Sequence, residues 1–152
     1  NIDLKGEDPE IARLYAESLA RHRAWERTIT GSFHGAVLRR FRSLAPACIT
    51  SMHPSEVRAA VVLNRPPLLL LTPLAAKIIR GSLFQIPEYH GRMRVANPRL
   101  IRSWAKAGVP VQVWTVNDPD KAKRLFRMGV RGVFSDRPAE LLEALRGFDP
   151  DA

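Results

Sequence analysis

The sequence has one cysteine and no apolar run long enough to span a membrane. Because Cys48 has no second cysteine to pair with, the fold cannot depend on an intramolecular disulfide or on an oxidising compartment, and a cytoplasmic location is favoured. The longest apolar stretch, residues 66–74, falls well short of the roughly 20 residues that a membrane helix needs. It is more typical of a core or barrel-rim segment, and contact with a membrane surface or detergent stays an open alternative.

The chain also lacks an initiator methionine and the pattern of a signal peptide. It opens with the strand-like run Asn1–Lys5, and no apolar segment of the signal-peptide kind follows. We therefore expect that processing or truncation has removed a segment upstream of Asn1.

Positive charge exceeds negative charge, with 24 Lys and Arg against 15 Asp and Glu and a net charge of +9. Such a balance suits an anionic partner, for example nucleic acid, an acidic membrane or a phosphate ester. Arginines occur in every segment without a run of like charge, and aromatic residues are not interleaved with them. A nucleic-acid-binding platform is therefore not expected.

The hydrophobic pattern predicts one domain of six units, each a strand followed by a helix. Asp8-Pro9, Asn97-Pro98 and Asp118-Pro119 carry the capping side chain and first-turn proline that begin helices. Gly108 and Gly129 end two of the helices. Residues 68–80 are ambiguous, and we predict a helix only for their second half, Pro73–Arg80. The strands are predicted over residues 2–5, 28–33, 48–52, 82–86, 109–116 and 130–135. This alternation predicts an α/β fold with a parallel sheet and right-handed crossovers.

Alternation alone does not distinguish an open sheet from a closed barrel, because both bury their strands on two faces. No strand is followed by a glycine-rich phosphate-binding fingerprint, and residues 31–35 lack the required spacing. Polar residues instead follow the strands, where barrel enzymes place their reactive groups. Strand ends are also polar in other α/β proteins, so this interpretation stays open. The residues are Lys5, Ser32, His53, Gln85, Asn117 and Asp136.

Five stretches resemble the glycerophosphodiester phosphodiesterase family. Residues 109–117 (VPVQVWTVN) and 129–138 (GVRGVFSDRP) are similar to its last two strands, "V-x-V-W-T-V-N" and "G-V-D-G-I-x-T-D-x-P". Residues 1–5 (NIDLK) resemble its "N-I-E-L-K" strand, residues 31–33 its "S-S-F", and residues 85–88 its "Q-x-P" segment. The five stretches follow the family's order across nearly the whole chain.

The resemblance implies a (β/α)₈ TIM barrel in which Asn1–Lys5 is the third strand. Residues 1–147 would then be its C-terminal part, about six βα units, with 148–152 as a short tail. In the family, the first two units carry a His-Arg-Gly strand end, a metal-binding Glu-x-Asp pair and a second histidine, and none of these motifs occurs here. The implied reaction, part of lipid metabolism, is metal-dependent hydrolysis of glycerophosphodiesters to glycerol 3-phosphate and an alcohol. The isolated chain is expected to be inactive, and no residue of it is assigned as catalytic.

Three residues match functional positions of the family. Asp3 matches a metal-binding glutamate, and a carboxylate suits a hard cation such as Ca²⁺ or Mg²⁺. Lys5, on the same strand face, matches a lysine that faces the substrate phosphate, and Trp114 matches a tryptophan near the glycerol end of the pocket. From the residues alone, Lys5 could equally be an exposed strand-end lysine and Trp114 a structural part of the barrel wall.

The four histidines and Ser32 give no independent catalytic signal. None of His22, His34, His53 and His90 has a metal-type partner or matches a catalytic histidine of the family, although His53 is the best placed. Ser32 departs from the G-x-S-x-G elbow of esterases, because it directly follows Gly31. The competing hypothesis is a non-catalytic scaffold or partner-binding module derived from a barrel.

Overall fold

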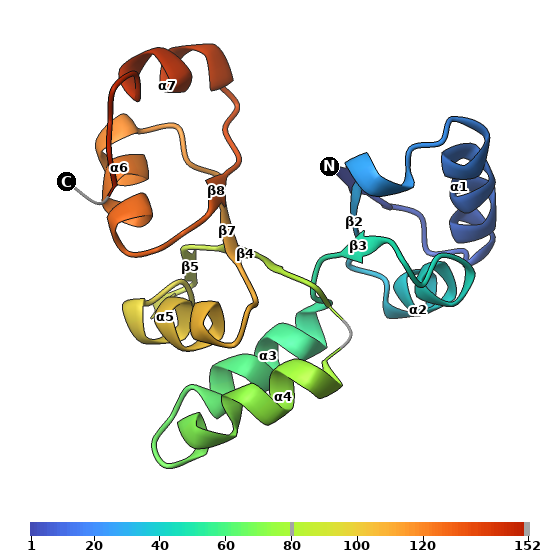
Figure 1. Ribbon diagram of the computed structural model, residues 1–152, viewed down its shortest axis with the longest axis horizontal. Coiled ribbons are helices and arrows are strands. Elements are labelled where there is room, and N and C mark those ends of the chain that lie inside the picture. Colours follow the sequence, from blue (N-terminus) through green and yellow to red (C-terminus); the bar gives the residue numbers. More distant parts are fainter. Residues whose placement is uncertain (80, 151–152) are drawn as a thin grey trace. The chain divides into compact units, whose positions relative to one another are not determined.

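The computed structural model describes residues 1–79 and 81–150 and divides into two compact units (Figure 1). The first unit contains residues 1–58 and 79–83, and the second contains residues 59–78 and those from 84 onward. Both units combine helices with parallel strands, which confirms the predicted α/β class. None of the helices in the described residues has the length and apolar character needed to cross a membrane.

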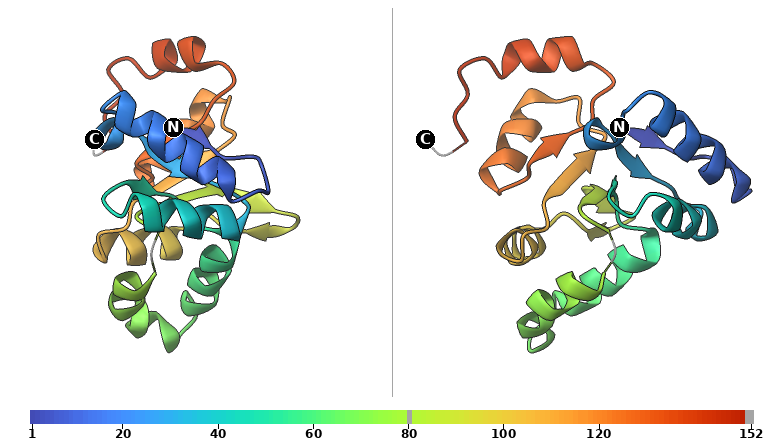
Figure 2. Two further views of the ribbon diagram at one scale, coloured as in Figure 1. Left: turned by 90° about the vertical axis from the view of Figure 1, so that its right-hand side faces the viewer. Right: turned by 45° about the vertical axis from the view of Figure 1, so that its right-hand side comes forward.

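The first unit contains a three-stranded parallel sheet in the order β1-β2-β3. Its strands and helices are β1 (Ile2–Asp3), α1 (Glu10–Arg21), the 3₁₀ turn η1 (Trp25–Arg27), β2 (Ile29–Gly31), α2 (Gly35–Leu44) and β3 (Ile49–Thr50). In the parallel register Asp3 lies opposite Gly31 and Thr30 opposite Thr50. Beyond β3, Ser51 forms a parallel bridge with Leu83. Figures 1 and 2 show α1 and α2 packed together on one side of this sheet.

Small residues let the two helices of this unit approach closely. Ala12 and Ala16 of α1 are buried against Val37 and Phe41 of α2, and Leu4 closes the cluster from the end of β1. The apolar stripe of each helix therefore faces the core, as its 3.6-residue period predicts.

The second unit contains the parallel sheet β4-β7-β8. Its elements are the C-terminal part of α3 (Pro54–Leu63), η2 (Leu68–Leu71), α4 (Thr72–Ile78), β4 (Phe84–Pro87), β5 (Tyr89–His90), β6 (Met93–Arg94), α5 (Pro98–Lys106), β7 (Val111–Trp114), α6 (Pro119–Arg127), β8 (Gly132–Val133) and α7 (Pro138–Ala144). Figures 1 and 2 show α5 and α6 on the same side of this sheet. The Trp104 ring of α5 packs edge-on against Phe84 of β4, with ring centroids 5.1 Å apart.

Two of the three helix caps expected from the sequence are present, whereas α1 begins at Glu10 with Pro9 and not Asp8 at its N-cap. The Asn97 side chain accepts a hydrogen bond from the Leu100 amide at 3.0 Å, and Asp118 accepts from the Asp120 amide at 2.8 Å. Gly129 follows α6 with φ of 99°, a conformation that favours glycine. These local signals therefore position α5 and α6 beside the second sheet.

Three details differ from the sequence expectation. The strands are shorter than predicted, and Gln85 lies within β4 because that strand continues to Pro87, so its expected place at a strand end is wrong. The antiparallel hairpin β5–β6, which turns at Gly91 (φ 59°), was not predicted. Helix α4 ends at Ile78, and the predicted helix end at Arg80 lies outside the described residues.

Candidate functional site

Asp3 and Lys5 form an ion pair at the C-terminal end of β1. The Lys5 Nζ atom lies 2.6 Å from Asp3 Oδ2, with 76% of the Lys5 side chain and 32% of the Asp3 side chain exposed. Leu4 between them is buried and donates its amide hydrogen to the Gly31 carbonyl at 2.8 Å. The alternation of the strand thus places both charged groups on the face opposite the core, as the two-residue spacing predicts.

The loop after β2 supplies an aromatic neighbour and a structural serine. Lys5 Nζ lies 5.4 Å from the Phe33 ring centroid, within the range of a cation–π interaction. The buried Ser32 hydroxyl donates to the Leu4 carbonyl at 2.7 Å and accepts from the His34 amide at 3.0 Å. Ser32 therefore holds the ends of β1 and β2 together, and its hydroxyl is not presented as a nucleophile.

The ring of His53 is held in one orientation by hydrogen bonds on both nitrogens. Nε2 lies 3.1 Å from the Phe33 carbonyl oxygen, which can only accept, so Nε2 carries the hydrogen. Nδ1 accepts from the Ser55 amide at 3.2 Å and lies 2.8 Å from the Ser55 hydroxyl. The histidine thus ties the loop after β2 to the start of α3.

An ion pair with little exposure supports this histidine. Arg42 of α2 binds both carboxylate oxygens of Glu56 at 2.9 and 3.0 Å, with side chains 10% and 19% exposed. Glu56 also accepts from the His53 amide at 2.7 Å, as a glutamate in the first turn of a helix does in a capping box. The arginine further contacts Thr50 and the Ser51 carbonyl, both at 3.0 Å. This network fixes the start of α3 at the end of β3.

In the second unit, Trp114 ends β7 with its side chain half-buried. Beyond it, Asn117 Oδ1 accepts from the Ser135 hydroxyl at 3.0 Å and from the Asp136 amide at 2.9 Å, while its Nδ2 donates to Asp136 Oδ2 at 3.0 Å. Two of the polar strand-end residues expected from the sequence, Asn117 and Asp136, therefore contact each other directly.

A buried carboxylate in this unit was missed by the sequence analysis. The Glu88 side chain is 4% exposed and lies 2.9 Å from Arg124, 3.1 Å from Lys121 and 3.3 Å from Arg94. Burial raises the pKa of Glu88, but hydrogen bonds and the charges of Arg124 and Lys121 outweigh burial and hold the pKa below its usual value. Because these partners lie on α6 and β6, the carboxylate joins elements distant in sequence.

Asp3 is the residue that the family resemblance predicts to be a metal ligand. Within residues 1–79 and 81–150, no three His, Cys, Asp or Glu side chains are grouped so that they could hold a metal ion, and Asp3 Oδ2 is occupied by Lys5. The described residues therefore do not fit a complete cation site by themselves.

A sequence model described as the glycerophosphoryl diester phosphodiesterase family matches residues 2–140. The chain belongs to this family. It is 30% identical over 143 residues to the probable glycerophosphodiester phosphodiesterase 2 of Mycobacterium tuberculosis, and this match covers 93% of the chain and 52% of the relative. The chain thus spans about half the length of that relative.

Solved structures of phosphodiesterases share the fold. One from Parabacteroides distasonis gives a TM-score of 0.68 at 24% identity, over 95% of this chain and 56% of that protein. An Oleispira antarctica phosphodiesterase, solved with the product sn-glycerol-3-phosphate, gives 0.69 at 20% identity, over 96% and 54%. These likenesses concern the fold, and they agree with the α/β fold that the sequence resemblance implies.

Proposed function

We propose that this chain is the C-terminal portion of an enzyme that hydrolyses glycerophosphodiesters to glycerol 3-phosphate and an alcohol. The observation that carries the proposal is the family match along residues 2–140. On this proposal, β1, β2, β3, β4, β7 and β8 correspond to the third to eighth strands of a (β/α)₈ barrel. The first two βα units would come from the part of the relatives that the chain does not cover.

Each member of the Asp3–Lys5 ion pair can exchange its partner for a ligand. Lys5 would bind the phosphodiester, and Asp3 would bind a cation. Both groups are accessible, so a phosphoryl oxygen can replace Asp3 at the Lys5 ammonium, which then neutralises negative charge on the phosphate. The freed Asp3 carboxylate would add one oxygen ligand for Ca²⁺ or Mg²⁺. Such a cation, when bound, would polarise the phosphoryl oxygens. Trp114 would lie against the glycerol end of the substrate.

We further propose that the two histidines acting as general acid and base lie outside this chain. His53 is the strand-end histidine of the described residues, and its ring nitrogens are engaged with the Phe33 carbonyl and with Ser55. On this proposal, proton transfer at the leaving alcohol and at the attacking water is carried out by the histidines that the family resemblance places in the first two βα units.

The test compares the chain with the full product of its gene. Release of glycerol 3-phosphate from glycerophosphocholine, glycerophosphoethanolamine and glycerophosphoglycerol is followed with and without Ca²⁺ or Mg²⁺. Release by the full product that stops when the cation is chelated supports the proposal. A full product that binds these compounds without releasing glycerol 3-phosphate would instead favour the non-catalytic scaffold.

A further inference from the structure

The η2–α4 segment exposes large apolar side chains. Leu70 of η2 is 84% exposed, and in α4 Leu74 is 58% and Ile78 is 70% exposed. Leu68 and Leu71 add exposed apolar area beside them. A grouped apolar surface of this kind on a folded domain marks a contact with a partner or a membrane.

Acidic residues are scarce in the segment that contains this surface, so its net charge is strongly positive. Residues 57–117 hold nine Arg and Lys and one acidic residue, Glu88, so they contribute +8 of the net charge of +9. Arginines do occur throughout the chain, but acidic residues are nearly absent from this segment. The Glu88 carboxylate is buried and already paired with three cations. The cations of this segment that lie in the second unit therefore attract anions.

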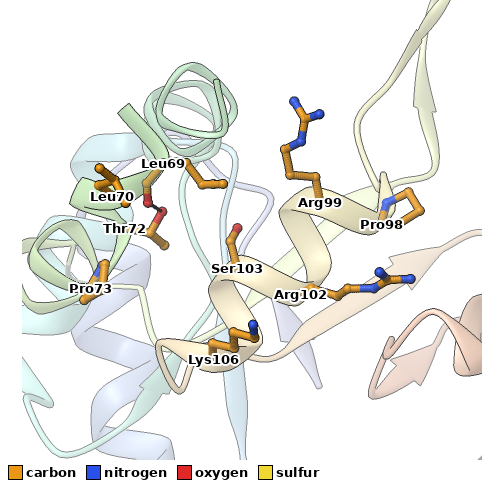
Figure 3. Close-up of a pocket in the computed structure, with 9 residues that line it drawn as sticks. All are labelled: Leu69, Leu70, Thr72, Pro73, Pro98, Arg99, Arg102, Ser103 and Lys106. Atoms are coloured by element: carbon orange, nitrogen blue, oxygen red, sulfur yellow. Dashed lines mark hydrogen bonds between the residues drawn. The ribbon is translucent and has the colours of Figure 1, made fainter. Parts of the chain in front are cut away.

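A groove of about 630 Å³ joins the apolar and basic groups within the second unit (Figure 3). One wall carries Leu69, Leu70 and Pro73, and a hydrogen bond from the Thr72 hydroxyl to the Leu69 carbonyl fixes the turn between η2 and α4. The other wall is α5, where Arg99, Arg102 and Lys106 recur at helical spacing and are exposed. None of these three cations has an ion pair among the described residues.

We propose that this surface docks on an anionic lipid membrane, and we call it the docking face: Leu69, Leu70, Pro73, Arg99, Arg102 and Lys106. Segments that lie in the membrane interface typically combine apolar side chains with Lys and Arg. The apolar groups enter the acyl boundary, and the cations contact phosphate headgroups. The inference does not depend on the proposed catalytic function.

Charge complementarity favours lipid over two other occupants. A second copy of the chain on the same face would bring the basic rows of two α5 helices together, and like charges repel. A nucleic acid would be attracted by the cations, but the leucines offer no aromatic ring on which a base could stack. An anionic bilayer satisfies the apolar and the basic groups at once.

The experiment measures co-sedimentation with vesicles of phosphatidylcholine that contain about 30% phosphatidylglycerol, and with vesicles of phosphatidylcholine alone. Both the 152-residue chain and the full gene product are used. We expect binding to the anionic vesicles that weakens as salt is raised from about 0.1 to about 0.5 M. Each cation near such a surface strengthens binding about fivefold, so R99Q/R102Q/K106Q should weaken it roughly 100-fold. Leu70→Ser should weaken it about tenfold by removing apolar insertion.

The matched control is R21Q/R23Q/R39Q, which removes the same charge from exposed positions of the first unit. If this control binds the anionic vesicles nearly as well as wild type, the docking face is supported. If both triple variants lose binding equally, net charge alone explains the binding and the proposal is overturned. It is also overturned if Leu70→Ser binds like wild type, or if the isolated chain binds but the full product does not. Binding to polyuridylate in preference to vesicles, or a dimer that Leu70→Ser dissociates, would identify a different occupant.

Discussion

The Lys5 ammonium lies between the Asp3 carboxylate, 2.6 Å away, and the Phe33 ring, whose centroid is 5.4 Å away. An ion pair as exposed as this one stabilises a fold by at most about 1 kcal/mol. Exchanging it for contacts with a ligand therefore costs little. The pair therefore contributes little to the stability of the sheet.

The first prediction separates the roles of Asp3 and Lys5 in the full gene product. Asp3→Ala should lower kcat/KM at limiting Ca²⁺ or Mg²⁺ and recover in part at high concentration, because a lost oxygen ligand weakens cation binding. Lys5→Ala should lower kcat/KM at every cation concentration, because charge neutralisation on the phosphate is lost. If Asp3→Ala matches wild type at limiting cation, Asp3 is a strand-end carboxylate without a role in cation binding.

The second prediction is that the purified 152-residue chain does not hydrolyse glycerophosphocholine, with or without added Ca²⁺ or Mg²⁺. The general acid and base typically contribute about 10²–10⁴-fold each, and both ring nitrogens of His53 are already hydrogen-bonded. A colorimetric assay for released choline measures the rate. If this chain turns over the substrate and His53→Ala abolishes the turnover, the proposal that the catalytic histidines lie outside this chain is wrong.

The third prediction concerns Glu88 and pH. Its pKa is lower in the folded chain than the ordinary value of about 4.5, so the folded state binds fewer protons than the unfolded state near that pH. The stability that Glu88 contributes is therefore present above the ordinary pKa and is lost as pH falls through the lowered folded value. Urea unfolding from pH 7 to 3 should show a smaller decline for Glu88→Gln than for wild type.

The same variant should be less stable than wild type at pH 7, by about 2–3 kcal/mol, because Arg94, Lys121 and Arg124 lose their buried counter-charge. Glu140→Gln is the control, since its carboxylate is 73% exposed. Parallel pH curves for wild type and Glu88→Gln would contradict the prediction.

The features that could be predicted from the sequence are those fixed by neighbouring residues. Asn97 and Asp118 cap helices through amides two or three residues away, so short-range spacing sufficed to find both. The shared face of Asp3 and Lys5 followed in the same way from the two-residue period of a strand.

The features that were missed depend on contacts between distant residues. Arg124 lies 36 residues from Glu88, and Arg42 lies 14 residues from Glu56. No local pattern specifies which cation will meet a buried carboxylate, because the packing of separate elements decides it. The hairpin β5–β6 was missed for another reason: strands of two residues are too short for a period to show.

The last prediction tests the Arg42–Glu56 pair as the support of the strand-end loops. Glu56→Gln keeps an oxygen that can accept from the His53 amide but removes the charge that Arg42 binds at two atoms. Loss of one partner of a pair with so little exposure should lower the free energy of unfolding by about 2–3 kcal/mol. Glu56→Ala should cost about 1 kcal/mol more, because the helix also loses its cap.

Urea unfolding at pH 7 measures both variants, with the exposed pair Arg137–Glu140 as the control. Glu140→Gln should change the free energy of unfolding by less than about 0.5 kcal/mol. Arg42→Lys should not preserve wild-type stability, since an ammonium cannot reproduce the forked contact with both carboxylate oxygens. If Glu56→Gln is as stable as wild type, the pair does not hold the start of α3. The orientation of His53 would then rest on its own ring contacts with Phe33 and Ser55.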